Sequence, residues 1–327
     1  MLSILGMGFA HPKNEIYNSF IEELEIGTNE EWILDKIGIQ RRLTTLPIKY
    51  IAETRNSDPR KGRAIADHNT TSLAVDAAKG AIQSAQISPE QIGLIICNTC
   101  TPEQVAPAES QRIAAELGIE AKAYDVISAC PAFALHMSYL SNYEESALPD
   151  YVLCVSAAVL TQSVNYNDRS DSAIWGDGAS AWIVSTKHPG KLRMLDSYFT
   201  ADPTRCDAVV VDTFGHFHQD GRAVRDFSVR QTVRLIKRLE VEYDIDWEKD
   251  IFVGHQANRT MLAQITNNRK IPDSNHWFNV TEIGNQAGAG APATLAANWE
   301  KICSGQKIVV AVVGAGLSWG SVLFEAV

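Results

Sequence analysis

The residue best suited to covalent chemistry is Cys130, which stands between Ala129 and Pro131. A β-rich apolar run ends at small residues, the cysteine follows, and a proline then opens a helical stretch. Proline is favoured at the first position of a helix, because the N–H group that it lacks would be unpaired there. We therefore expect Cys130 at or near a helix N-cap, where free N–H groups and the helix dipole favour a thiolate. The alternative is a buried structural cysteine.

Two further polar side chains follow predicted strands. His255 follows an apolar run at 251–253 and Gly254, and Asn285 follows a predicted strand at 277–280. A lone histidine or asparagine in such a place often only satisfies the backbone or caps a turn. In open α/β sheets, however, ligands and catalytic groups gather at the carboxyl ends of strands. Together with Cys130, these side chains predict a nucleophile accompanied by two hydrogen-bonding partners.

A fourth feature is the small-residue run Gly314-Ala315-Gly316, which follows a predicted strand at 307–313. Small residues let backbone N–H groups approach a ligand closely. The run is therefore either a tight turn between strands or a donor to an oxyanion.

The elements that must position these groups alternate between short apolar strands and helices, which predicts an α/β protein with a largely parallel sheet. The expected strands are 93–97, 151–155, 181–184, 251–253, 277–280, 307–313 and 317–324, and the expected helices are 73–85, 111–117 and 228–243. The chain contains two similar units, each made of a helix, a short connection and a strand. The connection is Ile87-Ser88-Pro89-Glu90 in the first unit and Ile245-Asp246-Trp247-Glu248 in the second, and the similarity reflects either duplication or chance.

The turn-forming cluster at 187–190 predicts a boundary between two halves, 1–188 and 189–327. Residues 46–69 are charged and irregular, and we expect a long surface loop there with at most one short helix.

Composition narrows the function classes. The chain has 327 residues, of which 45% are hydrophobic and 21% charged, as in an ordinary soluble globular protein. Its net charge of −10 argues against nucleic acid as the main partner. No run of 18 apolar residues predicts a membrane span, and the first residues lack a secretory leader. Six scattered cysteines fit a reduced compartment, so we expect a cytoplasmic protein.

The chain resembles the β-ketoacyl-acyl-carrier-protein synthase III family over nearly its whole length. The matching motifs, in order, are Asn29-Glu30-Glu31-Trp32-Ile33, Ser128-Ala129-Cys130, Gly176-Asp177-Gly178-Ala179, His255-Gln256-Ala257-Asn258, Gly284-Asn285 and Ser318-Trp319-Gly320-Ser321. The resemblance implies a thiolase fold with a duplicated five-layer αβαβα architecture, and a homodimer.

The resemblance also implies a reaction. Cys130 would take an acyl group from coenzyme A, and His255 and Asn285 would stabilise the enolate formed when a malonyl thioester decarboxylates. The N–H groups of Cys130 and Ala315 would form the oxyanion hole. The implied product is a 3-oxoacyl thioester, with an acyl carrier protein as partner and neither cofactor nor metal. Thr28, Trp32 and Arg169 match positions that hold the coenzyme A nucleotide, and the remaining candidates for substrate binding are Ala106, Glu109, Asn258 and Arg259.

Several residues depart from the family pattern. Pro131 follows the nucleophile, Ala106 stands where many members have a bulky residue of the acyl pocket, and Glu109 lies nearby. Segment 46–69 is an insertion, and Thr260 stands where a basic residue is usual. These departures affect which acyl starter and which acceptor the protein would use. The sequence therefore favours neither a specialised pathway nor primary fatty-acid synthesis over the other.

The residue types also bear on two alternative functions. An acyl-Cys130 could pass its group to a hydroxyl or amine of a small molecule, but the presence of both His255 and Asn285 favours condensation. A degenerate partner subunit is disfavoured because all three catalytic residue types are present.

Three further patterns carry less weight. Cys97 and Cys100 form a C-x-x-C pair without a second pair at zinc spacing, and His216 and His218 lack a supporting carboxylate or cysteine. A basic run is either a solvated helix face or a docking site for an acidic carrier protein; it comprises Arg222, Arg225, Arg230, Arg234, Lys237 and Arg238.

Overall fold

The main strands repeat one arrangement twice. In the computed structural model, which describes residues 1–213 and 215–327, ten strands form one sheet in the order β12-β11-β13-β14-β8-β1-β7-β6-β4-β5. Numbered along the chain within each half, both halves have the strand order 3-2-4-5-1. In each half the first two pairings are parallel and the other two antiparallel. The two halves are therefore structural repeats.

The strands of the first half are β1 (Ser3–Ala10), β4 (Ile92–Asn98), β5 (Lys122–Asp125), β6 (Tyr151–Ala158) and β7 (Gly178–Ser185). Those of the second half are β8 (Leu192–Ala201), β11 (Ile251–Gly254), β12 (His276–Trp277), β13 (Lys307–Gly314) and β14 (Ser318–Ala326). The halves meet where β1 pairs with β8, at Ser3 with Arg193 and at Ile4 with Leu192. A turn between Ser185 and Leu192 connects the halves along the chain, so a division at 188/189 remains a prediction.

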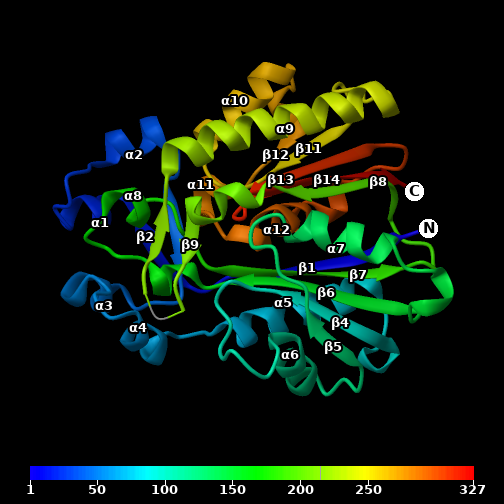
Figure 1. Cartoon of the computed structure of the whole chain (residues 1–327), viewed down its shortest axis with the longest axis horizontal. Coiled ribbons are helices and arrows are strands. Elements are labelled where there is room, and N and C mark those ends of the chain that lie inside the picture. Colours follow the sequence, from blue (N-terminus) through cyan, green and yellow to red (C-terminus); the bar gives the residue numbers. More distant parts are fainter. Residues whose placement is uncertain (214) are drawn as a thin grey trace.

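Helices complete five layers (Figure 1). Helices α5 (Thr70–Ala85) and α6 (Glu109–Leu117) cover the outer face of the first half-sheet, and α9 (Gly221–Tyr243) and α10 (Arg259–Arg269) cover that of the second. Between the half-sheets lie α7 (Ala132–Ser141) and α12 (Gly290–Ala297). A central helix must be apolar on most of its surface, as the buried Phe133 and Leu295 illustrate. The expected five-layer αβαβα architecture is confirmed.

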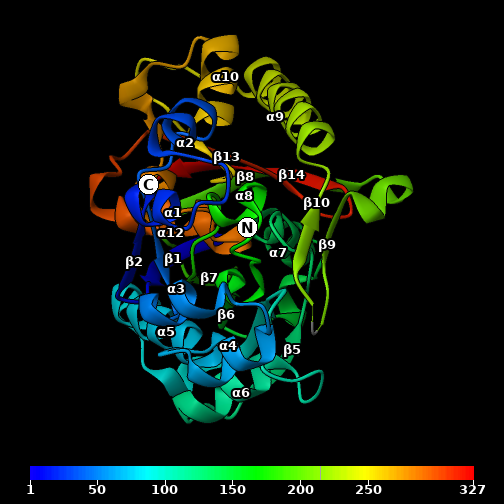
Figure 2. The ribbon, with the colours of Figure 1, turned by 90° about the vertical axis from the view of Figure 1, so that its left-hand side faces the viewer.

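Shorter elements gather at the end of the molecule that faces the viewer in Figure 2. They include α1 (Asn18–Glu23), α2 (Glu30–Lys36), α3 (Ile48–Thr54), α4 (Pro59–Ile65), α8 (Arg169–Ser172), β2 (Asn14–Tyr17), and the hairpin of β9 (Val209–Val211) and β10 (Phe217–Gln219). Strand β3 (Arg41–Thr44) pairs with β2, and α11 (Val280–Ile283) packs against β3.

Two expectations about strands were wrong. The sheet is mixed rather than largely parallel, because the pairings near its middle are antiparallel. Helices cover both faces of each half-sheet, so parallel and antiparallel strands both read as continuous apolar runs in the sequence. The strand expected at 277–280 ends at Trp277, and α11 begins at Val280.

The expectation of a long loop at 46–69 was also wrong, since this segment contains both α3 and α4. Asp58 caps α4 by accepting a hydrogen bond from the Arg60 N–H, and Pro59 occupies the first turn. The buried Asn56 fixes the segment to the body, because its Nδ2 donates to the carbonyls of Gln162 and Val164, each at 2.9 Å.

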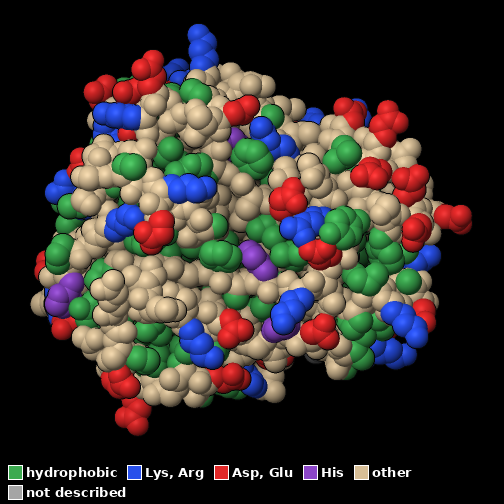
Figure 3. Space-filling model, turned by 180° about the vertical axis from the view of Figure 1, so that it is seen from behind, with side chains coloured by type: hydrophobic (Ala, Val, Ile, Leu, Met, Phe, Trp, Pro, Cys, Tyr) green, Lys and Arg blue, Asp and Glu red, His purple; other side chains and the backbone are tan. Residues whose placement is uncertain are grey.

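The surface carries both signs of charge. On the face opposite to that of Figure 1, acidic and basic side chains lie mixed (Figure 3). Among residues 1–213 and 215–327, no helix has the length and apolar character needed to cross a membrane. Those same residues contain no cluster of three or more His, Cys, Asp or Glu side chains that could hold a metal ion.

Candidate active site

Cys130 lies in a tight connection between β5 and α7. Ala129, just before it, has a left-handed φ of +54°. Asn98, at the end of β4, fixes this turn: its Oδ1 accepts from the Ser128 N–H at 3.0 Å, and its Nδ2 donates to the Ala129 carbonyl at 3.2 Å. Helix α7 begins at Ala132 with Pro131 as its N-cap residue. Cys130 therefore directly precedes the cap, close to the expected position.

Two glycines let the halves approach this turn closely. A Cβ atom on Gly288 would lie 2.5 Å from the Ala129 carbonyl oxygen, and one on Gly314 would lie 2.5 Å from the Cβ of Cys130. Real Cβ contacts are essentially never shorter than 3.0 Å, so both positions need glycine. Both glycines belong to the second half, so the turn that holds Cys130 is shaped by both repeats.

His255 directly follows β11, where its backbone N–H donates to the Ala311 carbonyl at 3.0 Å. Its side chain is 5% exposed, and burial lowers the pKa of His255 to about 4. The ring is therefore neutral at pH 7. Its buried Nδ1 has no hydrogen-bond partner in the described part of the chain. The ring can thus carry its single proton on Nε2, which leaves Nδ1 an unpaired acceptor.

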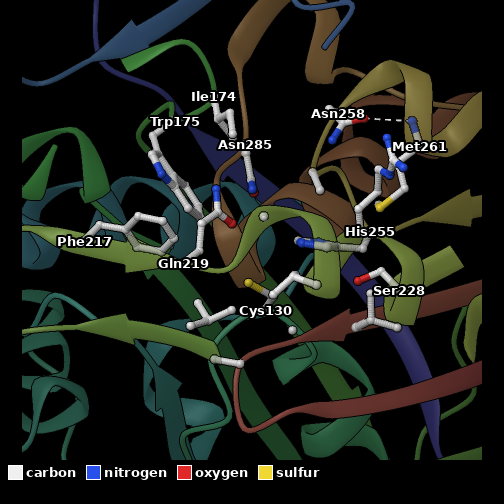
Figure 4. A pocket seen from close by; sticks show the side chains of 18 residues that line it. Cys130, Ile174, Trp175, Phe217, Gln219, Ser228, His255, Asn258, Met261 and Asn285 are labelled. Carbon is white, nitrogen blue, oxygen red and sulfur yellow. Dashed lines mark hydrogen bonds between the residues drawn. The ribbon is translucent and has the colours of Figure 1, made fainter. Parts of the chain in front are cut away.

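Asn285 is held by the residues before the 176–178 turn. Its N–H donates to the Ile174 carbonyl at 2.9 Å, and it forms a β-bridge with Trp175. The side-chain Oδ1 accepts a hydrogen bond from the Ala287 N–H at 2.9 Å. Because the oxygen is engaged there, the amide NH2 group is left to face the cavity as a donor (Figure 4).

One cavity of about 140 Å³ brings the three side chains together. Cys130, His255 and Asn285 line it and point toward the same space from three separate loops (Figure 4). Gly314 and Ala315 also line it, as the sequence led us to expect for Ala315. A thiol, a neutral imidazole and an amide donor facing one enclosed space suit a covalent acyl intermediate followed by stabilisation of an enolate.

The thiol itself is strongly desolvated. Burial raises the pKa of Cys130 to about 12, and nearby Cys100 acts in the same direction. The backbone N–H groups of Ala315 and Cys130 act in the opposite direction, so both lie where they can stabilise negative charge at the sulfur. The expected preference for a thiolate is therefore outweighed by burial, and the thiol is the resting form at neutral pH.

Other lining residues were not anticipated from the sequence. Trp175 and Phe217 pack edge to face with ring centroids 4.6 Å apart, and Gln219 and Ser228 line the same cavity (Figure 4). Phe217 and Gln219 are two residues apart on β10 and so share one face, and the hairpin of β9 and β10 places them over Cys130. The two-residue spacing of Phe217 and Gln219 was the one signal in the sequence that could have indicated that both line the cavity.

The three residues expected at the nucleotide of coenzyme A lie together at a second site. The Arg169 guanidinium lies 5.0 Å from the ring centroid of Trp32 and donates to the Gly27 carbonyl at 2.7 Å. Thr28 and Trp32 line a surface pocket of about 380 Å³ there. A flat aromatic ring beside a guanidinium can stack on a nucleobase.

Asn258 and Arg259 occupy the start of α10. Asn258 lines the Cys130 cavity, and its side chain caps α10 by accepting from the Met261 N–H at 2.7 Å. Arg259 lies over the ring of Phe278 at 4.3 Å and reaches Asp273 at 3.4 Å. A binding role for either residue stays a prediction.

Ala106 and Glu109 lie apart from Cys130. Ala106 is exposed, and neither residue belongs to the described linings of the cavities next to the cysteine. Glu109 is 1% exposed, and its carboxylate accepts hydrogen bonds from the Thr71 hydroxyl and, at 3.0 Å, from the Glu103 N–H. These bonds give Glu109 a structural explanation, and contact of either residue with an acyl chain stays a prediction.

Residues 176–178 have a structural role. The buried Asp177 carboxylate accepts from the N–H and hydroxyl of Thr45, both at 2.8 Å, and from the Thr161 N–H at 2.8 Å. It thereby ties the residue after β3 and the segment after β6 to the start of β7 (Gly178–Ser185).

Comparisons with known proteins identify relatives along nearly the whole chain. The model of 3-oxoacyl-[acyl-carrier-protein] synthase III matches residues 124–203, and the model of its C-terminal part matches residues 243–326. The β-ketoacyl-[acyl-carrier-protein] synthase III of Aquifex aeolicus is 28% identical over 326 residues, 98% of each chain. The crystal structure of the Aquifex aeolicus enzyme superposes with a TM-score of 0.85 at 26% identity, covering 99% of this chain and 100% of that one. A priming β-ketosynthase of a polyketide biosynthetic pathway superposes with a TM-score of 0.82 at 25% identity, covering 100% and 96%.

Proposed function

The chain belongs to the 3-oxoacyl-[acyl-carrier-protein] synthase III family, and from that premise we propose that it performs a decarboxylative Claisen condensation through acyl-Cys130. It is a condensing acyltransferase with the thiolase fold.

In the first half-reaction, the Cys130 sulfur attacks the carbonyl carbon of an acyl-coenzyme A. The carbon–sulfur bond to coenzyme A breaks, and the thiol proton ends on the released coenzyme A. The N–H groups of Cys130 and Ala315 receive the oxyanion of the tetrahedral intermediate, since both already lie beside the sulfur. Thr28, Trp32 and Arg169 hold the nucleotide of the donor.

In the second half-reaction, a malonyl or β-ketoacyl thioester occupies the cavity beside the acylated cysteine. Loss of CO2 from malonyl leaves an electron pair on the α-carbon, with negative charge on the thioester oxygen. The neutral His255 ring and the Asn285 amide donate hydrogen bonds to that oxygen without protonating the carbon. The carbanion then attacks the acyl carbonyl, Cys130 leaves as thiolate, and a 3-oxoacyl thioester forms.

The acceptor is proposed to arrive on an acyl carrier protein. Acyl carrier proteins are acidic, and α9 presents exposed arginines and a lysine beside the cavity that Arg225 and Ser228 line. We further propose a homodimer, as the resemblance to the family implies. A malonyl acceptor fits the second half-reaction, whereas a β-ketoacyl acceptor would need a base to remove its α-proton. Primary and specialised metabolism both fit the proposal.

The observation that carries the proposal is the convergence of Cys130, His255 and Asn285 on one cavity. The test is incubation with a panel of acyl-coenzyme A donors and malonyl-carrier protein, followed by mass spectrometry. We expect one acyl adduct on Cys130, release of CO2 and a 3-oxoacyl product. An acyl adduct on Cys130→Ala would overturn the assignment of the nucleophile. Transfer of the acyl group to a hydroxyl or amine without CO2 release would establish the alternative, simple acyl transfer.

A further inference from the structure

We propose that a second cavity beyond Cys130 binds a carboxylate at the far end of the acyl group, with Arg63 as its partner. The preferred starters would then be ω-carboxyacyl thioesters of medium length. This inference rests on the proposed function, because it requires that Cys130 carries an acyl group.

Two adjoining cavities lead away from the cysteine. The first, of about 230 Å³, begins at Cys130 and has mainly apolar walls, among them Leu160, Trp175, Val209, Phe217 and Ala287. The second, of about 500 Å³, shares Cys100 and Val211 with the first. Cys100 and Val211 thus border both cavities, and an acyl chain that starts on the Cys130 sulfur and passes between them would reach the second cavity. Each methylene buried on the way contributes ~0.8 kcal/mol.

The second cavity is polar where the first is apolar. Arg63, Glu103, Gln104 and Thr213 line it. The Glu103 carboxylate is already engaged by the Thr70 N–H at 2.9 Å. An acyl chain that ended there in a methyl group would leave these polar groups without a ligand partner, whereas a polar terminus could bind them.

The positive charge of Arg63 favours an acidic group over other polar groups at the end of the acyl chain. Within the residues that the structure describes, Arg63 has neither an ion-pair partner nor a side-chain hydrogen bond. Arg60, one turn earlier in α4, pairs with Asp58 at 3.2 Å. A half-buried guanidinium without a partner among the described residues, at the end of an apolar channel, has the charge and shape to bind a carboxylate through two parallel hydrogen bonds.

The inserted segment holds Arg63 at this place. Gly62 packs against Asn56, since a Cβ atom on Gly62 would lie 2.4 Å from the Asn56 Oδ1. Asn56 is bonded in turn to the carbonyls of Gln162 and Val164. The insertion at 46–69, which departs from the family pattern, thus brings a cation to the far end of the acyl channel and keeps it there.

The test compares two donors of equal chain length, octanoyl-coenzyme A and its analogue with a carboxylate on the eighth carbon. The rate of Cys130 acylation is measured by intact mass for the full-length protein, for Arg63→Gln and for Arg60→Gln as the matched control in the same helix. We expect the unaltered protein to react faster with the carboxylated donor. The ratio of the two rates should fall about tenfold or more in Arg63→Gln, as for loss of a charged hydrogen bond, and should stay the same in Arg60→Gln.

Three outcomes would count against the proposal in different ways. If the unaltered protein reacts faster with octanoyl than with carboxylated donors of four to twelve carbons, the carboxylate site is wrong, and this comparison needs no variant. If Arg63→Gln keeps the ratio of the unaltered protein, a carboxylate preference has another cause and Arg63 is not its partner. If no donor of either kind acylates Cys130, the proposed function fails as well.

Discussion

Gly314 lies directly against Cys130, so that a Cβ atom on the glycine would lie 2.5 Å from the Cβ of the cysteine and 3.2 Å from its Sγ. The glycine ends β13 in the second half, and the cysteine follows β5 in the first. Ala315, whose N–H lies near the sulfur, is the next residue. The contact thus sets the distance between the nucleophile and its proposed oxyanion donor.

Gly314→Ala should therefore slow acylation of Cys130 at least tenfold, because the added methyl group must push the cysteine or the Ala315 amide out of place. The measurement is the rate of acyl-adduct formation by intact mass. Gly80→Ala in α5 serves as the control, since its Cβ would meet Gly8 at an ordinary 3.4 Å. An acylation rate unchanged in a folded Gly314→Ala would contradict this role of the contact.

His255→Ala and Asn285→Ala should retain acylation of Cys130 and lose decarboxylation of the malonyl thioester. Each removes a donor to the enolate oxygen, and loss of one such donor typically lowers the rate 100- to 1000-fold. The two half-reactions are measured separately, as the acyl adduct and as released CO2. Equal loss of both half-reactions in well-folded variants would refute this division between Cys130 and its neighbours.

The pH dependence of Cys130 alkylation tests the effect of burial. Burial raises the pKa of the thiol to about 12, so the thiolate is the minor form throughout the neutral range. Its population, and with it the rate of reaction with iodoacetamide, should rise about tenfold per pH unit from pH 6 to 9. The alkylated Cys130 peptide is followed by mass spectrometry, because Cys206 and Cys303 are exposed and also react. A plateau below pH 8 would show instead that the helix N-terminus or His255 stabilises the thiolate.

The pH dependence of decarboxylation tests the effect of burial on His255. Burial lowers its pKa to about 4, so the neutral ring that donates to the enolate is present above that value and is lost on acidification through it. Decarboxylation by the acylated enzyme should therefore stay constant from pH 8 to about 5. A fall centred near pH 6.5 would indicate an ordinary, solvated histidine.

The sequence identified residues whose position depends on the chain nearby. His255 follows β11, which can be read from its apolar run, and Cys130 was found from Pro131, the cap of the helix that follows it. The sequence did not predict elements that are held in place by contacts with distant parts of the chain. Helices α3 and α4 are held by Asn56 bonding to Gln162 and Val164, more than 100 residues away.

Contacts across the fold also explain what was missed in the site. Trp175 and Phe217 meet only because β9 and β10 form a hairpin over the cavity, and three-residue strands give little periodic signal. Thr28, Trp32 and Arg169 lie close together, and their role at the nucleotide, which the family resemblance implied and no local pattern indicated, stays a prediction. The family pattern likewise suggested Ala106, which lies exposed outside the described linings next to Cys130.

Trp32→Ala and Arg169→Ala should each raise KM for acyl-coenzyme A about three- to thirtyfold, as for loss of a stacking or cation–π contact. Neither should change the reaction with an acyl-N-acetylcysteamine thioester, which lacks the nucleotide. Steady-state kinetics with both donors separates the two effects. Equal losses with both donors would place these residues in the support of the fold rather than in nucleotide binding.

Helix α9 carries an exposed basic face. Arg230, Arg234 and Lys237 are spaced four and three residues apart, which places them on one side of the helix. Arg234 and Lys237 have no ion-pair partner among the described residues, whereas Arg238 pairs with Asp196 and Glu242.

Replacing Arg234 and Lys237 together by glutamate should weaken condensation with malonyl-carrier protein about tenfold or more at low salt. Like charges would then face the acidic carrier, and the association rate depends most on such long-range charge. The loss should shrink as salt is raised, because screening weakens the attraction in the unaltered protein. Condensation with malonyl-coenzyme A should be unaffected, and Lys79→Glu on α5, an outer helix of the other half, is the control for a single charge reversal away from α9. If the double variant loses activity equally with both acceptors, α9 supports the site but does not dock the carrier; if it loses nothing, the basic face is only solvated.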